Sequence, residues 1–152
     1  HDVGLVSEAG MPAVADPGSS VVRAAHDLGI SVVPLVGPVS LLLALAASGL
    51  NGQNFAFVGY LPQDAAQRSA RIKQLESLAF KTGQTQLWIE TPYRNAAMLE
   101  GLLQSLQAST RLTIASGLSS PSVNIQSHSV AQWKKGKQGP DGHTPAVYAI
   151  GP

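Results

Sequence analysis

Along the 152-residue chain, short apolar runs alternate with longer segments in which apolar residues recur at helical spacing. Short runs rich in Val, Ile, Leu and aromatic residues predict strands at 3–7, 30–36, 55–61, 85–90, 111–117 and 144–151. Between them, longer segments with apolar residues three and four positions apart predict helices at 16–29, 37–49, 64–80 and 92–107. Because strands and helices alternate almost without interruption, the pattern indicates an α/β fold rather than segregated layers.

Turn and capping residues place the ends of the first two helices. Asp16 is a candidate N-cap, Pro17 suits the first helical position, and Gly29 can end the first helix. The second helix, 37–49, is apolar nearly all round, so we expect it to be buried between layers. Turn residues at 50–54 interrupt the pattern and predict a domain boundary, with residues 1–52 in one domain and 53–152 in another.

Composition narrows the class of protein. The chain is 44% hydrophobic with a net charge of +1, and its longest apolar run, 41–47, is far shorter than the roughly 20 residues of a membrane span. The absence of cysteine removes disulfides and thiolate ligands, and the four histidines lack metal-ligand spacing. We therefore expect a cytoplasmic protein with no membrane segment and no metal.

Three strand-to-helix junctions carry the candidate chemistry. The segment 7–20 places glycine and proline where a loop can approach a ligand with its backbone. The junction at 36–40 leaves amides free at a helix N-terminus, which suits an anion, although a simple packing turn gives the same pattern. In the third, at 89–95, Arg94 can grip a phosphate or carboxylate, or instead pair locally with Glu90 or a helix carbonyl.

Other motifs are weaker. The serines of 117–122 form no nucleophile elbow, and neither a GxGxxG nor a Walker A loop occurs, which disfavours a hydrolase or a nucleotide-binding fold. Three lysines, at positions 134, 135 and 137, can meet RNA phosphates or simply be solvated.

Taken in order, the segments LVSEAGMPAVADPG, VVPLVGPVSLLLALAASGL, FAFVGYLP and LWIETPYRN resemble the tetrapyrrole methylase family. The resemblance is strongest to the branch that methylates the ribose 2′-oxygen of cytidine in small-subunit ribosomal RNA. It implies a two-domain α/β methyltransferase that binds S-adenosylmethionine between its domains and works as a homodimer. The chain would then hold the end of the N-terminal domain and the whole mixed-sheet C-terminal domain.

The same resemblance implies the site residues. By this resemblance the loop 7–12 would line the cleft near the methionine part of the cofactor. Arg94 is the candidate substrate-binding residue because its guanidinium can grip an anion. Glu8 and Glu90 are the candidate catalytic carboxylates, because they are the carboxylates at strand ends. The resemblance implies these cofactor-binding residues: Ser7, Ala9, Gly10, Pro12, Val39, Ser40, Ile89, Glu90, Ala115, Pro145 and Ala146.

This chain departs from the ribosomal branch in three places. The glycine- and proline-rich loop that opens family members is missing, so we expect the N-terminal part of the first domain to be absent. Residues 8–12 are Glu-Ala-Gly-Met-Pro, where the branch has Asp-Ala-Gly-Thr-Pro. Residues 90–94 are Glu-Thr-Pro-Tyr-Arg, where the branch has Glu-Ser-Pro-His-Arg. Residues 115–120 stand where that branch has Arg-Glu-Leu-Thr. The methyl acceptor, ribosomal RNA or a small molecule, stays open, and the alternative is a non-catalytic α/β binding or dimerisation module.

Overall fold

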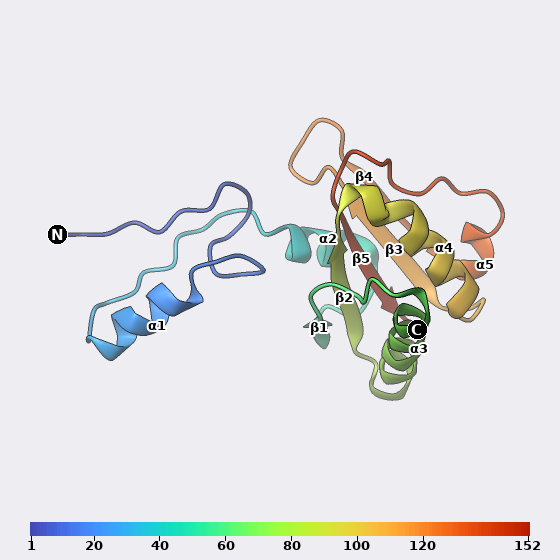
Figure 1. The fold of residues 1–152 in the computed structure, drawn as a ribbon, viewed down its shortest axis with the longest axis horizontal. Coiled ribbons are helices and arrows are strands. Elements are labelled where there is room, and N and C mark those ends of the chain that lie inside the picture. Colours follow the sequence, from blue (N-terminus) through green and yellow to red (C-terminus); the bar gives the residue numbers. More distant parts are fainter. The chain divides into compact units, whose positions relative to one another are not determined.

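The five strands form one mixed sheet in the order β1-β2-β5-β3-β4 (Figure 1). A computed structural model describes all 152 residues and divides them into two compact units, 1–39 and 40–152, each of which is described by itself. The sheet lies wholly in the second unit. Its strands are β1 (Phe55–Phe57), β2 (Thr85–Glu90), β3 (Arg111–Ser116), β4 (Asn124–Ser129) and β5 (Ala146–Gly151).

The directions of the strands bring three strand ends together. β1 runs parallel to β2, whereas β5 is antiparallel to both β2 and β3, so β2 and β3 point the same way. Glu90 at the end of β2 and Ser116 at the end of β3 both lie opposite Ala146, the first residue of β5. One end of the sheet therefore collects two carboxyl-terminal strand ends and one strand beginning. The predicted mixed-sheet α/β fold is confirmed.

One face of the sheet carries α3 (Ala65–Thr82) and α4 (Asn95–Ser105), the latter preceded by the 3-10 turn η1 (Pro92–Arg94). The Asp64 carboxylate caps α3 by accepting a bond from Gln67 N at 2.9 Å. Trp88 and Tyr148 stack on adjacent strands with ring centroids 5.7 Å apart. These rings join the main core with the following buried residues of the helices and strands: Ile72, Leu75, Met98, Leu102, Leu112, Ile114, Trp133 and Ile150.

Helix α2 (Ser40–Ser48) packs on the other face of the sheet, where it contacts β3, β4 and β5. Ser127 Oγ donates to the carbonyl of Ser48 at 2.6 Å, which ties the helix end to β4. The expectation that this helix is buried all round is wrong for this structure, because Leu42 and Leu43 are 50% and 40% exposed. Only the face with Leu41, Ala44, Leu45 and Ser48 is buried, since a single sheet can cover a single face.

The unit formed by residues 1–39 contains one helix, α1 (Ser19–Asp27), and no strand. The predicted strands at 3–7 and 30–36 are therefore wrong for this structure, because neither segment has a hydrogen-bonded partner strand. α1 also begins later than predicted, with Gly18 rather than Asp16 at its N-cap, and none of its residues is buried.

Two elements have no counterpart in the sequence prediction: β4 and the short helix α5 (Val130–Trp133). Conversely, the strand predicted at 55–61 ends at Phe57, because Gly59 adopts a φ of 78°. The domain division at residues 52 and 53 stays a prediction. None of the helices has the combination of length and apolar character that crossing a membrane requires.

Candidate functional site

A pocket of about 250 Å³ opens at the end of the sheet where β2 and β3 finish and β5 begins. Four separated segments contribute residues that the sequence singled out, and the structure brings six of these together: Ser40, Ile89, Glu90, Ala115, Pro145 and Ala146. Carboxyl ends of strands are the usual ligand-binding end of α/β sheets. The volume lies below the roughly 300 to 1,000 Å³ of pockets that enclose a drug-sized ligand, so this pocket fits part of such a molecule.

Six further lining residues were not anticipated from the sequence: Tyr60, Thr91, Ser116, Gly117, Leu118 and Val147. Three of them, Thr91, Ser116 and Val147, are direct neighbours of predicted residues, and Gly117 and Leu118 follow in the turn after β3. Proximity to the predicted strand ends is thus the signal that identifies them. Tyr60 lies in the loop after β1, within the segment FAFVGYLP, which was not singled out for a site residue.

The remaining predicted site residues, Ser7, Glu8, Ala9, Gly10, Pro12 and Val39, belong to the separate unit of residues 1–39. Within it, Ser7 Oγ donates to the carbonyl of Ala9 at 2.9 Å, and Gly10 has a φ of 79°, so this segment is a tight turn. A φ in this region favours glycine, which accounts for Gly10. Their cofactor-binding role stays a prediction.

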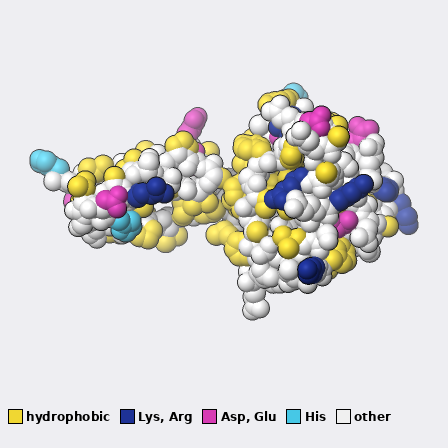
Figure 2. All heavy atoms as spheres, turned by 60° about the horizontal axis from the view of Figure 1, so that its bottom comes forward, with side chains coloured by type: hydrophobic (Ala, Val, Ile, Leu, Met, Phe, Trp, Pro, Cys, Tyr) yellow, Lys and Arg dark blue, Asp and Glu magenta, His cyan; other side chains and the backbone are white.

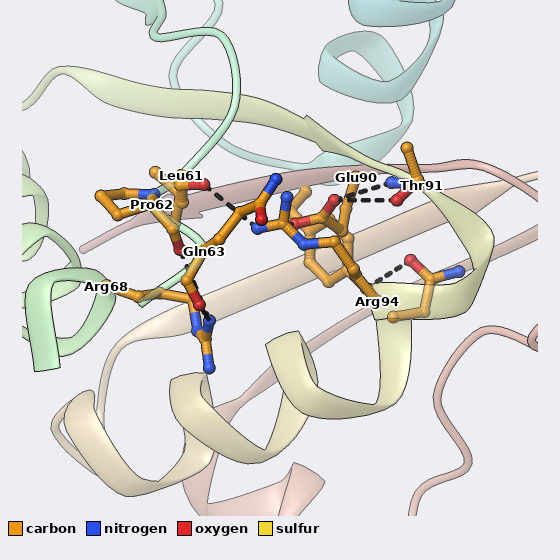
Figure 3. A network of polar contacts seen from close by, with 9 residues as sticks. Leu61, Pro62, Gln63, Arg68, Glu90, Thr91 and Arg94 are labelled. Carbon is orange, nitrogen blue, oxygen red and sulfur yellow. Dashed lines mark hydrogen bonds and ion pairs between the residues drawn. The ribbon is translucent and has the colours of Figure 1, made fainter. Parts of the chain in front are cut away.

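Glu90 and Arg94 form the one ion pair in the structure (Figure 3). Arg94 Nη2 lies 3.1 Å from Glu90 Oε2, although the two atoms are not aligned as a hydrogen bond. Glu90 Oε1 accepts bonds from the backbone N–H of Thr91 at 2.8 Å and from its hydroxyl at 3.3 Å. Because the Glu90 side chain is fully buried, the ion pair contributes to the fold as well as to the pocket. The structure shows the local pairing of Arg94 with Glu90 that the sequence offered as one of two hypotheses.

Arg94 also fixes the loop that carries Tyr60. Its Nη2 donates to the carbonyl of Leu61 at 3.2 Å (Figure 3). Ile89 N donates to the carbonyl of Gly59 at 3.1 Å. Farther along the same loop, Arg68 Nη1 donates to the carbonyl of Gln63 at 2.7 Å. The loop is therefore held at both ends by backbone carbonyls that accept from defined donors, which keeps Tyr60 at the pocket rim.

The opposite wall, at Pro145 and Ala146, is positioned by Asn95. The amide of this buried side chain donates to the carbonyls of Asp141 and Thr144 at 3.0 and 2.9 Å, while its oxygen accepts from the Tyr148 hydroxyl at 3.0 Å. Burial, and secondarily the Glu90 carboxylate, raise the pKa of Tyr148 well above its usual range, so the phenol stays a donor. Every polar atom of the Asn95 side chain thus serves to hold the segment that leads into β5.

A tight turn follows β3 and forms a third part of the wall. Gly117 has a φ of 62°, and its carbonyl accepts from Ser120 N at 3.0 Å and from Ser120 Oγ at 2.7 Å. A Cβ at this position would lie 2.6 Å from the carbonyl oxygen of Ser122. Glycine is therefore required both by the backbone conformation and by the close approach of the chain.

Lowering the pH should loosen the loop before β5. Asp141 accepts bonds first from His143 N and then from Thr144 N, and these lower the pKa of the Asp141 carboxyl below its ordinary 3.8. A depressed folded-state pKa means that the stabilisation is present above the unfolded-state value and disappears as the pH falls through the folded-state value. We expect the amide proton shifts of His143 and Thr144 to titrate together with a midpoint below 3.8.

An Asp141→Asn variant is the matched control, since its amide oxygen can still accept but no longer titrates. A shared midpoint at or above 3.8 in the unsubstituted chain would contradict the carboxylate's role in ordering this loop.

Chemically, the pocket offers backbone groups and apolar walls rather than a nucleophile next to a base. Glu90 Oε1 accepts from Thr91, Glu90 Oε2 lies beside Arg94 without a hydrogen bond, and no group of three or more His, Asp or Glu side chains is placed to hold a metal ion. Such a site suits binding and orientation of a ligand that brings its own reactive group.

Comparison with known proteins identifies relatives of the chain. It is 36% identical over 132 residues to the ribosomal RNA small subunit methyltransferase I of Pseudomonas aeruginosa, which spans 87% of this chain and 45% of that protein. The protein of the same name from Vibrio cholerae is 35% identical over 130 residues, covering 86% of this chain and 44% of its own length. No family model matches. The chain spans less than half the length of these curated relatives.

Solved structures with the same fold include the methyltransferase CobJ, with a TM-score of 0.56 and 18% identity over 93% of this chain and 61% of that one. A uroporphyrin-III C-methyltransferase from Thermus thermophilus, solved with S-adenosylhomocysteine, has a TM-score of 0.51 and 18% identity over 93% of this chain and 62% of that one. The chain is thus similar in sequence to ribosomal RNA small subunit methyltransferase I proteins, and it shares the fold of these solved methyltransferases. In this chain, the pocket lies at the sheet end formed by β2, β3 and β5.

Proposed function

We propose that the protein is a methyltransferase that uses S-adenosylmethionine, and that the pocket at the ends of β2 and β3 holds part of this cofactor. The observation that carries the proposal is the convergence of six predicted cofactor residues, from four separate segments, on one pocket in a chain related to methyltransferases. These four segments are far apart in the sequence, so their residues lie together at one pocket because of the fold. A solved relative of the same fold carries S-adenosylhomocysteine.

The proposed chemistry is an in-line transfer of the sulfonium methyl group to an acceptor atom. S-adenosylmethionine supplies the electrophilic carbon, so the chain's own task is to bind, orient and exclude water. The wall segments at Ala115–Gly117 and Pro145–Ala146 would do this with backbone groups, and the networks around Arg94 and Asn95 would keep these walls in place.

We expect Glu90 to act as a positioning residue rather than as a general base, since its carboxylate already accepts from Thr91 and faces Arg94. Glu8 then remains the other carboxylate proposed for proton removal. The loop 7–12 stays a proposed cofactor-binding segment of the other unit.

Further expectations concern partners and location. We propose ribosomal RNA as the methyl acceptor, because the curated relatives are named as small-subunit ribosomal RNA methyltransferases. We propose a homodimer, which is supported by apolar side chains exposed on edge strand β1, Phe55 at 43% and Phe57 at 37%. A cytoplasmic location would follow from a ribosomal substrate.

The cofactor proposal is tested by isothermal titration of the chain with S-adenosylhomocysteine. We expect saturable heat that is lost when Ala146 is replaced by tryptophan, because the larger side chain would fill the pocket. Val123→Trp is the matched control, since Val123 is 51% exposed and does not line the pocket. The absence of heat at millimolar ligand would reject the proposal and favour a non-catalytic binding or dimerisation module.

A further inference from the structure

The near-neutral net charge of the chain conceals two oppositely charged parts. Residues 40–152 contain nine Lys and Arg against five Asp and Glu, whereas residues 1–39 contain one arginine against four carboxylates. Two of the five carboxylates in the second unit, Glu76 and Glu90, are buried. The surface of this unit is consequently more basic than its composition suggests, and Figure 2 shows several dark-blue basic side chains on it with few magenta acidic ones.

Five basic side chains gather around one edge of the sheet. We name them the basic edge: Arg111 at the start of β3, His128 on β4, and Lys134, Lys135 and Lys137 in and after the turn that ends α5. The three lysines are exposed, and Arg111 and His128 are partly exposed. Burial, followed by the positive charges of Lys137 and Arg111, lowers the pKa of His128, because both cations lie near its ring.

The lysine segment is held against the sheet rather than extending freely. Trp133 is 2% exposed, its Nε1 donates to the carbonyl of Leu112 at 2.9 Å, and its ring meets that of His128 edge-on at 5.5 Å. Beyond the lysines, Gln126 Nε2 on β4 donates to the carbonyl of Gln138 at 3.0 Å. The segment is thus anchored before and after the lysines, which fixes the cations beside edge strand β4.

No carboxylate neutralises these cations. The only ion pair in the structure joins Arg94 to Glu90, so each Lys and Arg of the basic edge lacks an acidic partner within 4.0 Å. Unpaired cations on a fixed surface suit a polyanion, because each contact with a phosphate releases condensed counterions.

We infer that the basic edge binds the phosphate backbone of the RNA that the enzyme methylates, an inference that rests on the proposed function. Two polar side chains on β4, Asn124 and Gln126, add hydrogen-bond donors for the RNA phosphate backbone. An anionic membrane would need an apolar face next to the cations, but Trp133 is buried and supplies none. Since phosphate contacts position a nucleic acid without reading its sequence, this surface would orient the substrate, not select it.

The test compares two triple variants of the 152-residue chain that lose the same charge. One is Lys134→Gln, Lys135→Gln and Lys137→Gln; the control is Arg71→Gln, Lys73→Gln and Lys81→Gln on α3. Binding of a labelled RNA hairpin of about 20 nucleotides is followed by fluorescence anisotropy between about 50 and 200 mM KCl. Vesicles with anionic lipid form a parallel series.

We expect the basic-edge variant to bind RNA at least about fivefold more weakly, and the slope of log affinity against log salt to fall by about two to three. The α3 variant should stay within about twofold of the unsubstituted chain. Equal losses in the two variants, unchanged binding in the basic-edge variant, failure of the unsubstituted chain to bind RNA, or a preference for vesicles would each overturn the inference.

Two further readouts separate this inference from the proposed function. Both variants should keep the thermal midpoint of the unsubstituted chain and its titration heat with S-adenosylhomocysteine. A chain that binds RNA through the basic edge but gives no heat with S-adenosylhomocysteine would reject the methyltransferase proposal and leave the RNA surface standing as a binding function. The reverse result would reject the RNA surface alone.

Discussion

Replacing Arg94 with alanine should lower the free energy of unfolding by about 2 to 4 kcal/mol, because it leaves the buried Glu90 carboxylate without its counter-charge. The substitution also removes the donor to the carbonyl of Leu61. Chemical denaturation of the two proteins measures the difference. The substrate-binding role of Arg94 stays a prediction, and a test of it must account for this loss of stability.

The matched control is the double variant Glu90→Gln with Arg94→Ala. A neutral amide can still accept from Thr91 but carries no charge to compensate, so the double variant should recover at least half of the loss. If the single variant is as stable as the unsubstituted chain, or if the double variant recovers nothing, the ion pair is not what stabilises this part of the pocket.

Replacing Gly117 with alanine should cost about 2 to 4 kcal/mol of stability and weaken S-adenosylhomocysteine binding at least about tenfold. The added Cβ would lie 2.6 Å from Ser122 O and 3.0 Å from Ser122 C, both backbone atoms that no rotamer change can move. The turn must therefore shift, and with it the pocket wall at Gly117 and Leu118. Thermal unfolding and titration calorimetry measure the two effects.

Gly59→Ala provides the comparison for this experiment. Gly59 also has a positive φ, 78°, but an added Cβ there meets nothing within 4 Å. Backbone strain alone should then cost about 1 to 2 kcal/mol. Equal losses at the two glycines would show that the contact with Ser122 is unimportant and that only the backbone conformation matters.

The sequence predicted the strands and helices of residues 65–117 and 144–151 because their apolar patterns match their burial. β2 and β5 are buried along nearly their whole length, and α3 has Ile72, Leu75 and Ala79 on one buried face. The segments that line the pocket follow from this, since strand ends are the points where a hydrophobic run gives way to a glycine or proline. The sequence does not show which of these strand ends lie side by side, because that depends on the order and direction of the strands in the sheet.

Other parts could not be predicted, for physical reasons. β4 reads NIQSHS, has one apolar residue, and is a strand because β3 pairs with it, not because of its own propensity. The segments 3–7 and 30–36 show the converse, since β-branched residues without a pairing strand leave Val3 90% and Val33 72% exposed. The contribution of Asn95 was hidden as well, because its three partners lie about fifty positions away in sequence.

The position of β5 between β2 and β3 also governs when the pocket can form. β2 and β3 have no hydrogen bonds to each other, and both pair instead with β5. β5 begins more than 25 residues after the end of β3, so neither pairing can form until that later strand is available. Contacts of such high sequence separation are formed late and slow folding. In a nascent chain, therefore, the facing edges of β2 and β3 stay unpaired until Ala146–Gly151 has left the ribosome, and the pocket at this end of the sheet cannot form before then.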